Sequence, residues 1–355
     1  MTTCSEKAVI AKRIGVELRR VHPARPALRI FDAGMGDGTV LNDLMRNMHR
    51  RFPHIPWLIV AKEISVEDVR LSLEKLADRF FEHPQLVMVI TNMNYGEAPN
   101  LKPRPATEKK LRWYDVALEG STSHEFCRQL RGLHPLIAEG WKIKISEKTG
   151  NPLYDSPSAL VLYRKDQDFT LDPIKPRPDW GGCQYDLVMA SQPYRIRISA
   201  EKKVKNVIAP LARSLASGGR MVVVQSMGGD PGMEIVHKIW PDDNPFQAGR
   251  HELLKEAEKH LTDIEDKDLE FTPYSDRQSV FKYHMHTSPS ELKRSIGVST
   301  VMSSWNAAVY VAQIEDERLS EAYKDGAYIE ATQTVLKEHG GLWFQDETFV
   351  ISRRR

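Results

Sequence analysis

The sequence predicts an α/β protein in which helices cover both faces of a mostly parallel β-sheet. The first observation is that short apolar runs alternate with helical stretches from residue 27 onward, because parallel strands need such crossovers between them. The second is that residues 27–34, 56–64 and 85–92 are apolar over most of their length. This is typical of strands buried on both faces.

Helices are predicted between these runs from apolar residues that recur at helical spacing. One covers residues 5–21 and leads into the sheet, another covers residues 38–52, and a third lies around residues 69–80. Together with the apolar runs they give the succession βαβαβ, from which parallel sheets are built.

Residues 100–182 interrupt this rhythm and are expected to be an insertion. They begin with a stretch rich in proline and lysine, which is typical of a loop. Residues 141–154 and 159–165 are expected to form a hairpin that could be part of a lid.

Two strand-like runs that contain Tyr-Asp, residues 113–120 and 184–191, compete for the place of the fourth central strand. The second is preferred because a helical stretch, the pair Gly218-Gly219 and a strongly apolar run follow it, which completes another α/β unit. Later strands are predicted at residues 303–314 and 347–355, with one helix at residues 319–341 between them.

The charge balance gives no reason to expect nucleic acid as a partner, because 50 lysines and arginines stand against 48 aspartates and glutamates and leave a net charge of +2. Cys4, Cys127 and Cys183 lack the spacing of a disulfide framework or a zinc site. No apolar run approaches the roughly 18 residues of a membrane span. A cytoplasmic protein without a membrane segment is therefore expected, and a homodimer is left open.

The clearest chemical signal is the stretch Asp-Ala-Gly-Met-Gly-Asp-Gly from Asp32 to Gly38. Glycines between a strand and a helix let a ligand come close to unpaired backbone N–H groups. A dinucleotide-binding fingerprint would need a glycine where Thr39 stands. This departure disfavours an NAD(P)-dependent oxidoreductase.

The same stretch resembles the first motif of class I S-adenosylmethionine-dependent methyltransferases, an acidic residue followed by alternating glycines. The resemblance implies a Rossmann-like sheet of seven strands. It also implies that Asp32, Gly34, Gly36 and Gly38 form the loop that passes under the methionine part of the cofactor.

The resemblance assigns two more cofactor residues. An acidic residue that ends the second strand binds the ribose hydroxyls in this family, and Glu63 stands there; a carboxylate can accept hydrogen bonds from both hydroxyls. A polar residue after the third strand lies beside the adenine, which implies Asn92, with Asn94 as the second choice.

Residues Ser191-Gln192-Pro193-Tyr194 follow the fourth predicted strand. They resemble the motif with which enzymes of this fold hold an amino or amide nitrogen, with Gln192 in place of a proline. The resemblance implies that Ser191 and a backbone carbonyl bind the nitrogen and that Tyr194 packs on it. An ordinary turn at the end of a strand is the alternative.

Methyl transfer depends on alignment and exclusion of water more than on acid–base help. A hydroxyl or ammonium acceptor would still need a group that takes its proton. His286, two residues after His284, is the candidate, with Tyr283 and Glu119 as further choices. No metal is expected, because the His-x-His pair lacks a third ligand at interpretable spacing.

The sequence therefore predicts an enzyme that transfers a methyl group from S-adenosyl-L-methionine to a small-molecule metabolite, with nitrogen as one acceptor. A NAD(P)-dependent oxidoreductase and a non-catalytic member of the same fold are the alternatives. A single domain is expected over residues 1–355: an N-terminal helix (1–29), a cofactor-binding half (30–99), the insertion or lid (100–182) and the second half of the sheet (183–355), with residues 231–300 covering the substrate.

Overall fold

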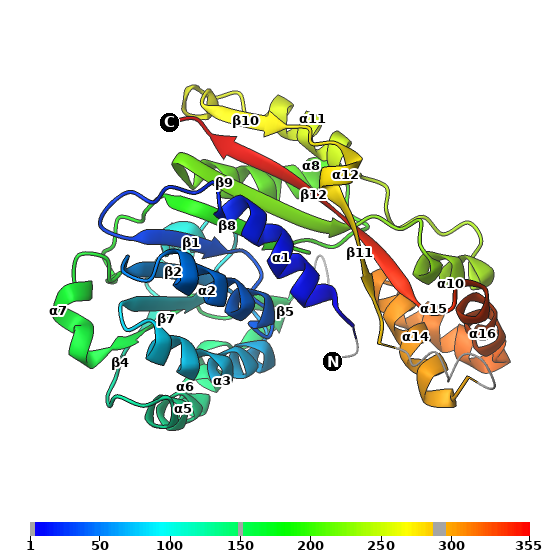
Figure 1. The fold of residues 1–355 in the computed structure, drawn as a ribbon, viewed down its shortest axis with the longest axis horizontal. Helices are drawn as coiled ribbons and strands as arrows, with labels where there is room; N and C mark the ends of the chain where they lie inside the picture. The colour runs from blue at the N-terminus through cyan, green and yellow to red at the C-terminus, as the bar shows by residue number, and fades with distance from the viewer. Residues whose placement is uncertain (1–3, 148–151, 287–295) are drawn as a thin grey trace.

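The computed structural model describes residues 4–147, 152–286 and 296–355. Over these residues a ten-stranded sheet has the order β10-β12-β9-β8-β1-β2-β3-β7-β4, with β11 paired to β12 (Figure 1). The strands are β1 (Leu28–Asp32), β2 (Trp57–Lys62), β3 (Leu86–Thr91), β4 (Arg112–Leu118), β7 (Ser158–Arg164), β8 (Tyr185–Ser191), β9 (Leu215–Ser226), β10 (Leu269–Thr272), β11 (Val280–His284) and β12 (Trp343–Arg353).

Seven of these strands form a sheet of the kind that the resemblance implied. β3, β2, β1, β8 and β9 are parallel neighbours, β12 runs antiparallel to β9, and β10 runs antiparallel to β12. The choice of residues 184–191 as the fourth central strand is thus confirmed. The strand order reverses at β1, which has β2 on one side and β8 on the other. Ligands bind at such a reversal, beyond the carboxyl ends of the strands.

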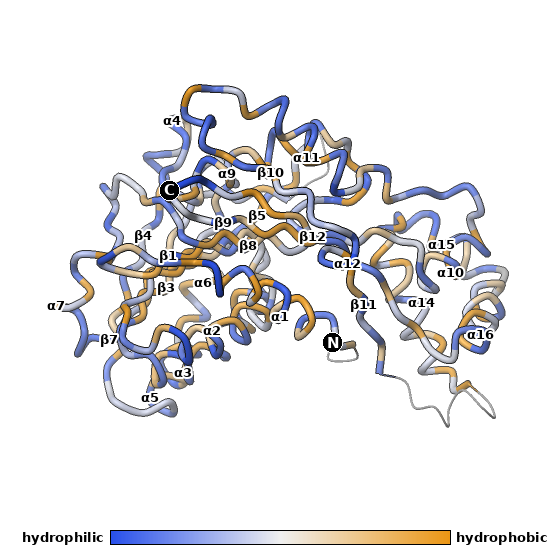
Figure 2. Tube along the Cα trace, turned by 45° about the horizontal axis from the view of Figure 1, so that its top comes forward, coloured by the Kyte–Doolittle hydropathy of each residue, from blue (hydrophilic) through white to orange (hydrophobic). Residues whose placement is uncertain are grey.

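Helices cover both faces of the sheet (Figure 1). A layer of buried apolar side chains fills the space between the sheet and the helices on each face. The apolar segments of the chain follow the strands and the inner sides of the helices (Figure 2). On one face lie α1 (Glu6–Leu18), α2 (Thr39–Arg51), α3 (Val66–Glu82), α5 (Ser123–Arg131) and α6 (His134–Gly140); on the other lie α7 (Asp168–Leu171), α8 (Ala200–Lys203), α9 (Ala209–Arg213) and α11 (Arg250–His260).

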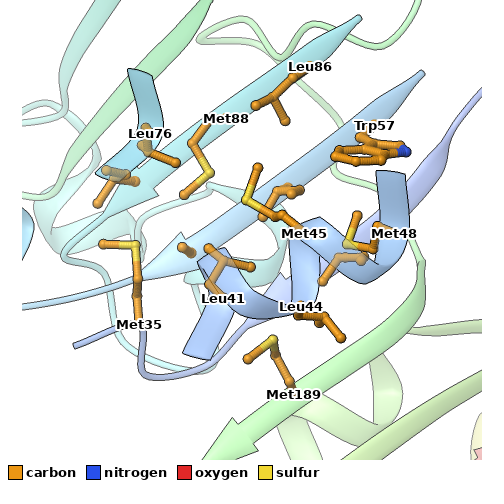
Figure 3. Close-up of a cluster of buried hydrophobic side chains, with 14 of the residues drawn as sticks. Met35, Leu41, Leu44, Met45, Met48, Trp57, Leu76, Leu86, Met88 and Met189 are labelled. Atoms are coloured by element: carbon orange, nitrogen blue, oxygen red, sulfur yellow. The ribbon is translucent and has the colours of Figure 1, made fainter. Parts of the chain in front are cut away.

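The packing of α2 shows why its sequence forms a helix. Leu41, Leu44, Met45 and Met48 recur at helical spacing and are all buried. They pack against β2 and β3, where Trp57 closes one end of the layer (Figure 3). Burying a side chain of this size stabilises the fold by about 1.5–3 kcal/mol, so this layer fixes how β1 leads into α2.

Residues 100–182 widen the sheet and do not form the expected lid. β7 pairs antiparallel with β3 and β4 pairs parallel with β7. β7 is buried along its whole length, as an internal strand requires. Of the expected hairpin, only β5 (Ile143–Ile145) and β6 (Pro152–Tyr154) pair with each other, and its tip, residues 148–151, lies outside the described residues.

The strand expected at residues 303–314 is wrong, because this segment lies in the helix α14 (Val298–Val311). Its β-branched and aromatic residues suggested a strand, yet Val301, Trp305 and Ala308 recur at helical spacing and are buried. They pack in a separate helical cluster with α10 (Pro231–Ile239), α15 (Asp316–Asp325) and α16 (Ala327–His339) at the far end of β11 and β12 (Figure 1). The sixth strand of the sheet is β10 instead.

At Gly38, in the loop that leads into α2, a side chain would not fit without strain. It is the N-cap residue of α2 with φ 76°, and a Cβ there would lie 2.8 Å from Cβ of the buried Ser72 in α3. We expect Gly38→Ala to lower the free energy of unfolding by about 2–4 kcal/mol, the sum of left-handed strain and overpacking. Unfolding in urea, followed by circular dichroism, measures the loss.

Gly326 supplies the matched control. It lies between α15 and α16 with φ 71°, and a Cβ there would have no atom within 4 Å. Gly326→Ala should therefore carry only the strain, about 1–2 kcal/mol. Equal losses in the two variants would contradict a role for the contact between Gly38 and Ser72.

Candidate active site

A cavity of about 670 Å³ lies beyond the carboxyl ends of β1, β8 and β9. Its floor comes from the loop after β1 and from the ends of β8 and β9, and its walls come from α1 and from residues 309–319. The cavity is therefore at the reversal of the strand order, and its volume is typical of a site for a small molecule.

Two glycines of the loop shape one side of this cavity. Gly36 has φ 53°, and a Cβ there would have no atom within 4 Å, so its place is open. A Cβ on Gly34 would lie 3.7 Å from the carbonyl oxygen of Ser191. A side chain at either position would narrow the space that the loop offers to a ligand.

Asp32 ends β1 below this loop and is only 1% exposed. Its Oδ1 accepts a hydrogen bond from the N–H of Gly34 at 3.2 Å, while Oδ2 has no donor among the described residues. Burial raises the pKa of Asp32 to about 7, and the nearby Glu63 raises it further. An unpartnered buried carboxylate is costly unless a proton or a cation satisfies it.

The carboxylate of Glu63 accepts hydrogen bonds from three backbone N–H groups. Its Oε2 accepts from the N–H of Gly36 at 2.8 Å, and Oε1 accepts from the N–H groups of Ile64 and Ser65 at 2.7 and 2.8 Å. A carboxylate offers about four lone pairs, so roughly one remains. Binding of both ribose hydroxyls by Glu63 stays a prediction, and it would require the amide of Gly36 to be released.

Asn92 is buried and its amide group is engaged away from the cavity. Its Nδ2 donates to the carbonyl oxygens of Gly140 and Ser156, and its Oδ1 accepts from the N–H of Ser158. It thus ties β3 to the segment 100–182, and no amide hydrogen is left for an adenine. Sequence reasoning missed this because the partners lie some fifty or more residues along the chain.

Tyr95 was not selected from the sequence, yet it lies across the carboxyl ends of the strands. Its hydroxyl donates to the carbonyl oxygen of Pro193 at 2.5 Å, and Lys62 Nζ lies 4.7 Å from the centre of its ring. Because Tyr95 follows β3 and Pro193 follows β8, this contact spans the ends of β2 and β1.

The residues of the turn after β8 point to different faces of the sheet. Ser191 and Gln192 line the cavity, but Tyr194 does not. The Tyr194 hydroxyl donates to Gln225 at 2.8 Å, and Lys203 Nζ lies 5.0 Å from its ring centre. The ring is thus part of the apolar layer on the opposite face of the sheet, so the expected packing of Tyr194 on a substrate in this cavity is not found.

His286 is not brought to the cavity either. It lies beyond the end of β11 and is exposed, as is His284, and neither residue lines the cavity. Nor does the segment 231–300 cover it where described; residues 287–295 lie outside the described part. The residues that cover the cavity belong to α1 and to α14 and α15.

A row of polar side chains joins Asp32 and Ser191, which the sequence indicated, to Ser226 and Asp346, which sequence reasoning missed. Asp32, Ser191, Ser226 and Asp346 end or lie near the ends of the neighbouring strands β1, β8, β9 and β12. The register pairs Asp32 with Met189, Ser191 with Val224, and Ser226 with Asp346. Since alternate residues share a face, all four lie on the face that carries α1. Polar residues at the ends of apolar strands were the available signal.

The far end of this row is the carboxyl group of Asp346, which is fully buried. Its Oδ2 has no donor among the described residues. Burial raises its pKa to about 8, and Glu6 and Asp230 raise it further. Each end of the row is therefore a buried carboxyl group with one oxygen that no described residue satisfies.

The strand order, the crossover helices and a cavity at the reversal define a Rossmann-like α/β fold. No protein-family model matches the chain, and no curated protein matches it at a significant level. None of the described helices combines the length and the apolar character that crossing a membrane requires.

Several solved structures are similar to this chain. One is assigned as a sarcosine dimethylglycine methyltransferase of Galdieria sulphuraria, with 10% identity and a TM-score of 0.39 over 98% of this chain and 86% of that chain. Another is geranyl diphosphate methyltransferase in complex with GPP and sinefungin, with 12% identity and a TM-score of 0.35 over 98% and 78%. A third is phosphoethanolamine N-methyltransferase 2 of Haemonchus contortus in complex with S-adenosyl-L-methionine, with 9% identity and a TM-score of 0.37 over 99% and 53%. With such low scores, the fold rests on the strand order and not on these likenesses.

The two buried carboxyls should make the stability of the protein depend on pH. An aspartate in the unfolded chain titrates near pH 3.9, whereas the folded pKa is about 7 for Asp32 and about 8 for Asp346. Between these values the folded state binds more protons, so the free energy of unfolding falls as the pH rises from about 4 to about 8. At about 1.4 kcal/mol per pKa unit, we expect a loss of about 4 kcal/mol for Asp32 and about 6 kcal/mol for Asp346.

Unfolding in urea at several pH values tests this expectation. Asp32→Asn should flatten the fall between about pH 4 and 7, and Asp346→Asn should flatten it up to about pH 8. Asp242→Asn, at an exposed position, is the control and should leave the slope unchanged. A wild-type slope in both buried-site variants would contradict the assignment.

Proposed function

We propose that this chain is an S-adenosyl-L-methionine-dependent methyltransferase that acts on a small molecule. The observation that carries the proposal is the glycine loop at the strand reversal with the unpartnered carboxylate oxygen of Asp32 beneath it. The sequence motif from Asp32 to Gly38 supports it, and the cavity of about 670 Å³ offers room for a ligand.

The chemistry of these residues fits the proposed cofactor. S-adenosyl-L-methionine would supply an activated methyl group on a positively charged sulfur. Asp32, the backbone at Gly34 and the open position at Gly36 would hold its cationic methionine end, and Glu63 would lie toward its sugar. A dinucleotide would instead place negative phosphates on the loop, next to the carboxyl groups of Asp32 and Asp37. This charge argument disfavours an NAD(P)-dependent oxidoreductase.

The rest of the cavity would receive the methyl acceptor. Ser191 lines it beside the glycine loop, so a nitrogen acceptor held by Ser191 is consistent with the turn motif, although Tyr194 points elsewhere. The chain's part in the reaction would be to align the acceptor and exclude water, which α1 and residues 309–319 do by covering the cavity. A cytoplasmic location stays a prediction.

Calorimetric titration with S-adenosylhomocysteine tests the cofactor assignment. We expect a dissociation constant on the order of micromolar and no detectable binding of NAD⁺ or NADP⁺. Gly36→Val should weaken the binding of S-adenosylhomocysteine at least about a hundredfold, about 2.8 kcal/mol, because a branched side chain would fill the open space above the loop.

Gly340→Val is the matched control for this experiment. Gly340 ends α16 with φ 65°, and a Cβ there would also have no atom within 4 Å, so the variant carries similar backbone strain far from the loop. It should bind S-adenosylhomocysteine as the wild type does. Unchanged affinity in Gly36→Val, or binding of NAD⁺ in place of S-adenosylhomocysteine, would refute the proposal.

Glu63→Gln gives a second, smaller effect. The amide keeps the size of the side chain but loses the charge that strengthens its hydrogen bonds, so we expect S-adenosylhomocysteine to bind about 1–3 kcal/mol more weakly. Glu67→Gln, on the exposed side of α3, is the control. A loss below about 0.5 kcal/mol in the Glu63 variant would place the sugar contact on another residue.

A further inference from the structure

Asp346 is a buried carboxyl group beside the cavity, at the end of the polar row that lies farthest from the glycine loop. It is opposite Ser226 in the sheet register, and Ser226 lines the cavity. Its Oδ2 has no donor among the residues that the structure describes. A buried carboxylate oxygen that is charged and unpaired destabilises the fold, so a cationic group beside it would be favoured.

Gln192 connects Asp346 to the cavity. Its backbone has φ 48°, a left-handed conformation that is strained in a residue that carries a Cβ. Its Nε2 donates to Ser226 Oγ at 3.0 Å and to Asp346 Oδ1 at 3.5 Å, and its Oε1 accepts from the N–H of Ser226 at 3.2 Å. The strained turn thus places a cavity-lining amide on one oxygen of Asp346, with the Ser226 hydroxyl close to the same carboxyl, while no described residue donates to Oδ2.

The groups around Asp346 are acidic. Glu6 of α1 lines the cavity, and burial raises its pKa as well. Asp230, before α10, and the hydroxyl of Tyr283 in β11 lie near the same carboxyl. Lys7 is the one cationic side chain among the described lining residues, and it is paired with Asp37 at 2.8 Å. This end of the cavity therefore favours a cation.

The wall formed by residues 309–319 carries several apolar side chains, beside the polar Gln313 and Asp316. Val309 and Ile314 are buried, Leu319 is packed beside them, and all three line the cavity together with Ile10 of α1. Tyr310 is 82% exposed and forms part of the rim. A ligand that fits both surfaces has an apolar body and a positively charged end.

We propose, on the basis of the methyltransferase function above, that the methyl acceptor is an organic amine with an apolar body, whose ammonium group is bound by Asp346 and Glu6 and gives a proton to Asp346. An ammonium ion has no lone pair, so the proton must leave before methyl transfer. The nitrogen lone pair then forms the N–C bond as the C–S bond breaks, with the electron pair of that bond remaining on sulfur. The proton on Asp346 passes to water when the product leaves.

Calorimetric titration of the protein saturated with S-adenosylhomocysteine tests this proposal. Hexylamine and 1-hexanol are the probes, because they share an apolar chain and differ in the cationic end. The titrations are made at pH 9, where Asp346 has lost its proton and an alkylammonium group still carries its charge. Hexylamine should bind at least about tenfold more tightly than 1-hexanol, and in Asp346→Asn the ratio should fall to about threefold or less. Glu6→Gln should reduce the ratio too, and it serves if Asp346→Asn does not fold.

Asp186→Asn is the matched control, because Asp186 is also a buried aspartate of the sheet but bonds the N–H of Arg29. It should keep the wild-type ratio. Equal binding of amine and alcohol, or a ratio unchanged in both Asp346→Asn and Glu6→Gln, overturns this inference while leaving the cofactor assignment intact. Failure of the wild type to bind S-adenosylhomocysteine refutes the proposed function itself.

The charge of the methylated product gives an independent measurement. Wild-type protein incubated with methyl-labelled S-adenosyl-L-methionine and a cell extract should produce a label that a cation exchanger retains at pH 7. The rate should rise with pH through about 8, where Asp346 loses its proton, and this rise should be absent in Asp346→Asn. A labelled product that is neutral or anionic overturns the proposal.

Discussion

The hydrogen bond from the N–H of Gly36 to the carboxylate of Glu63 is the contact on which the arrangement of the site depends. It joins the loop after β1 to the end of β2 and so fixes where the loop turns into α2. Asp37 then accepts from the N–H of Thr39 at the start of α2 and pairs with Lys7 of α1. Glu63 thereby positions the loop that forms the floor of the cavity. Asp37 holds α1, the helix that forms one wall.

The charge of the proposed ligands explains why the floor of the cavity contains polar residues whose burial destabilises the fold. Asp32 and Asp346 lie at the two ends of one row on the sheet, each buried and each with an oxygen that no described residue satisfies. A protein without a cationic ligand would gain stability from apolar residues at these places. Two separated carboxyls suit two cations, which in the proposed reaction are the methionine amino group of the cofactor and the ammonium group of the acceptor, with the sulfonium between them.

The sequence predicted the parts of the fold that depend on local physical rules. The glycine loop was predictable because positive φ and close approach favour glycine, and β8 was recognisable from the α/β unit that follows it. Residues 303–314 were assigned wrongly, because their β-branched and aromatic residues outweighed a helical spacing that becomes clear only once α10 and α16 pack against it. The role of Asn92 and the location of Asp346 depend on partners far along the chain, which no local pattern encodes.

Gln192 shows how a departure from a motif can itself carry information. In the sequence it replaces a proline of the nitrogen-binding turn and so weakens the resemblance. In the structure its φ of 48° is one that proline, held near −65°, could not adopt, and its side chain bonds both Ser226 and Asp346. Tyr194 meanwhile turns to the other face of the sheet. The ring of Tyr194 is therefore not placed to pack on a nitrogen, whereas the amide of Gln192 orients the carboxyl of Asp346. In the proposed reaction the charge of Asp346 binds the acceptor nitrogen, a role that aromatic packing has in the motif.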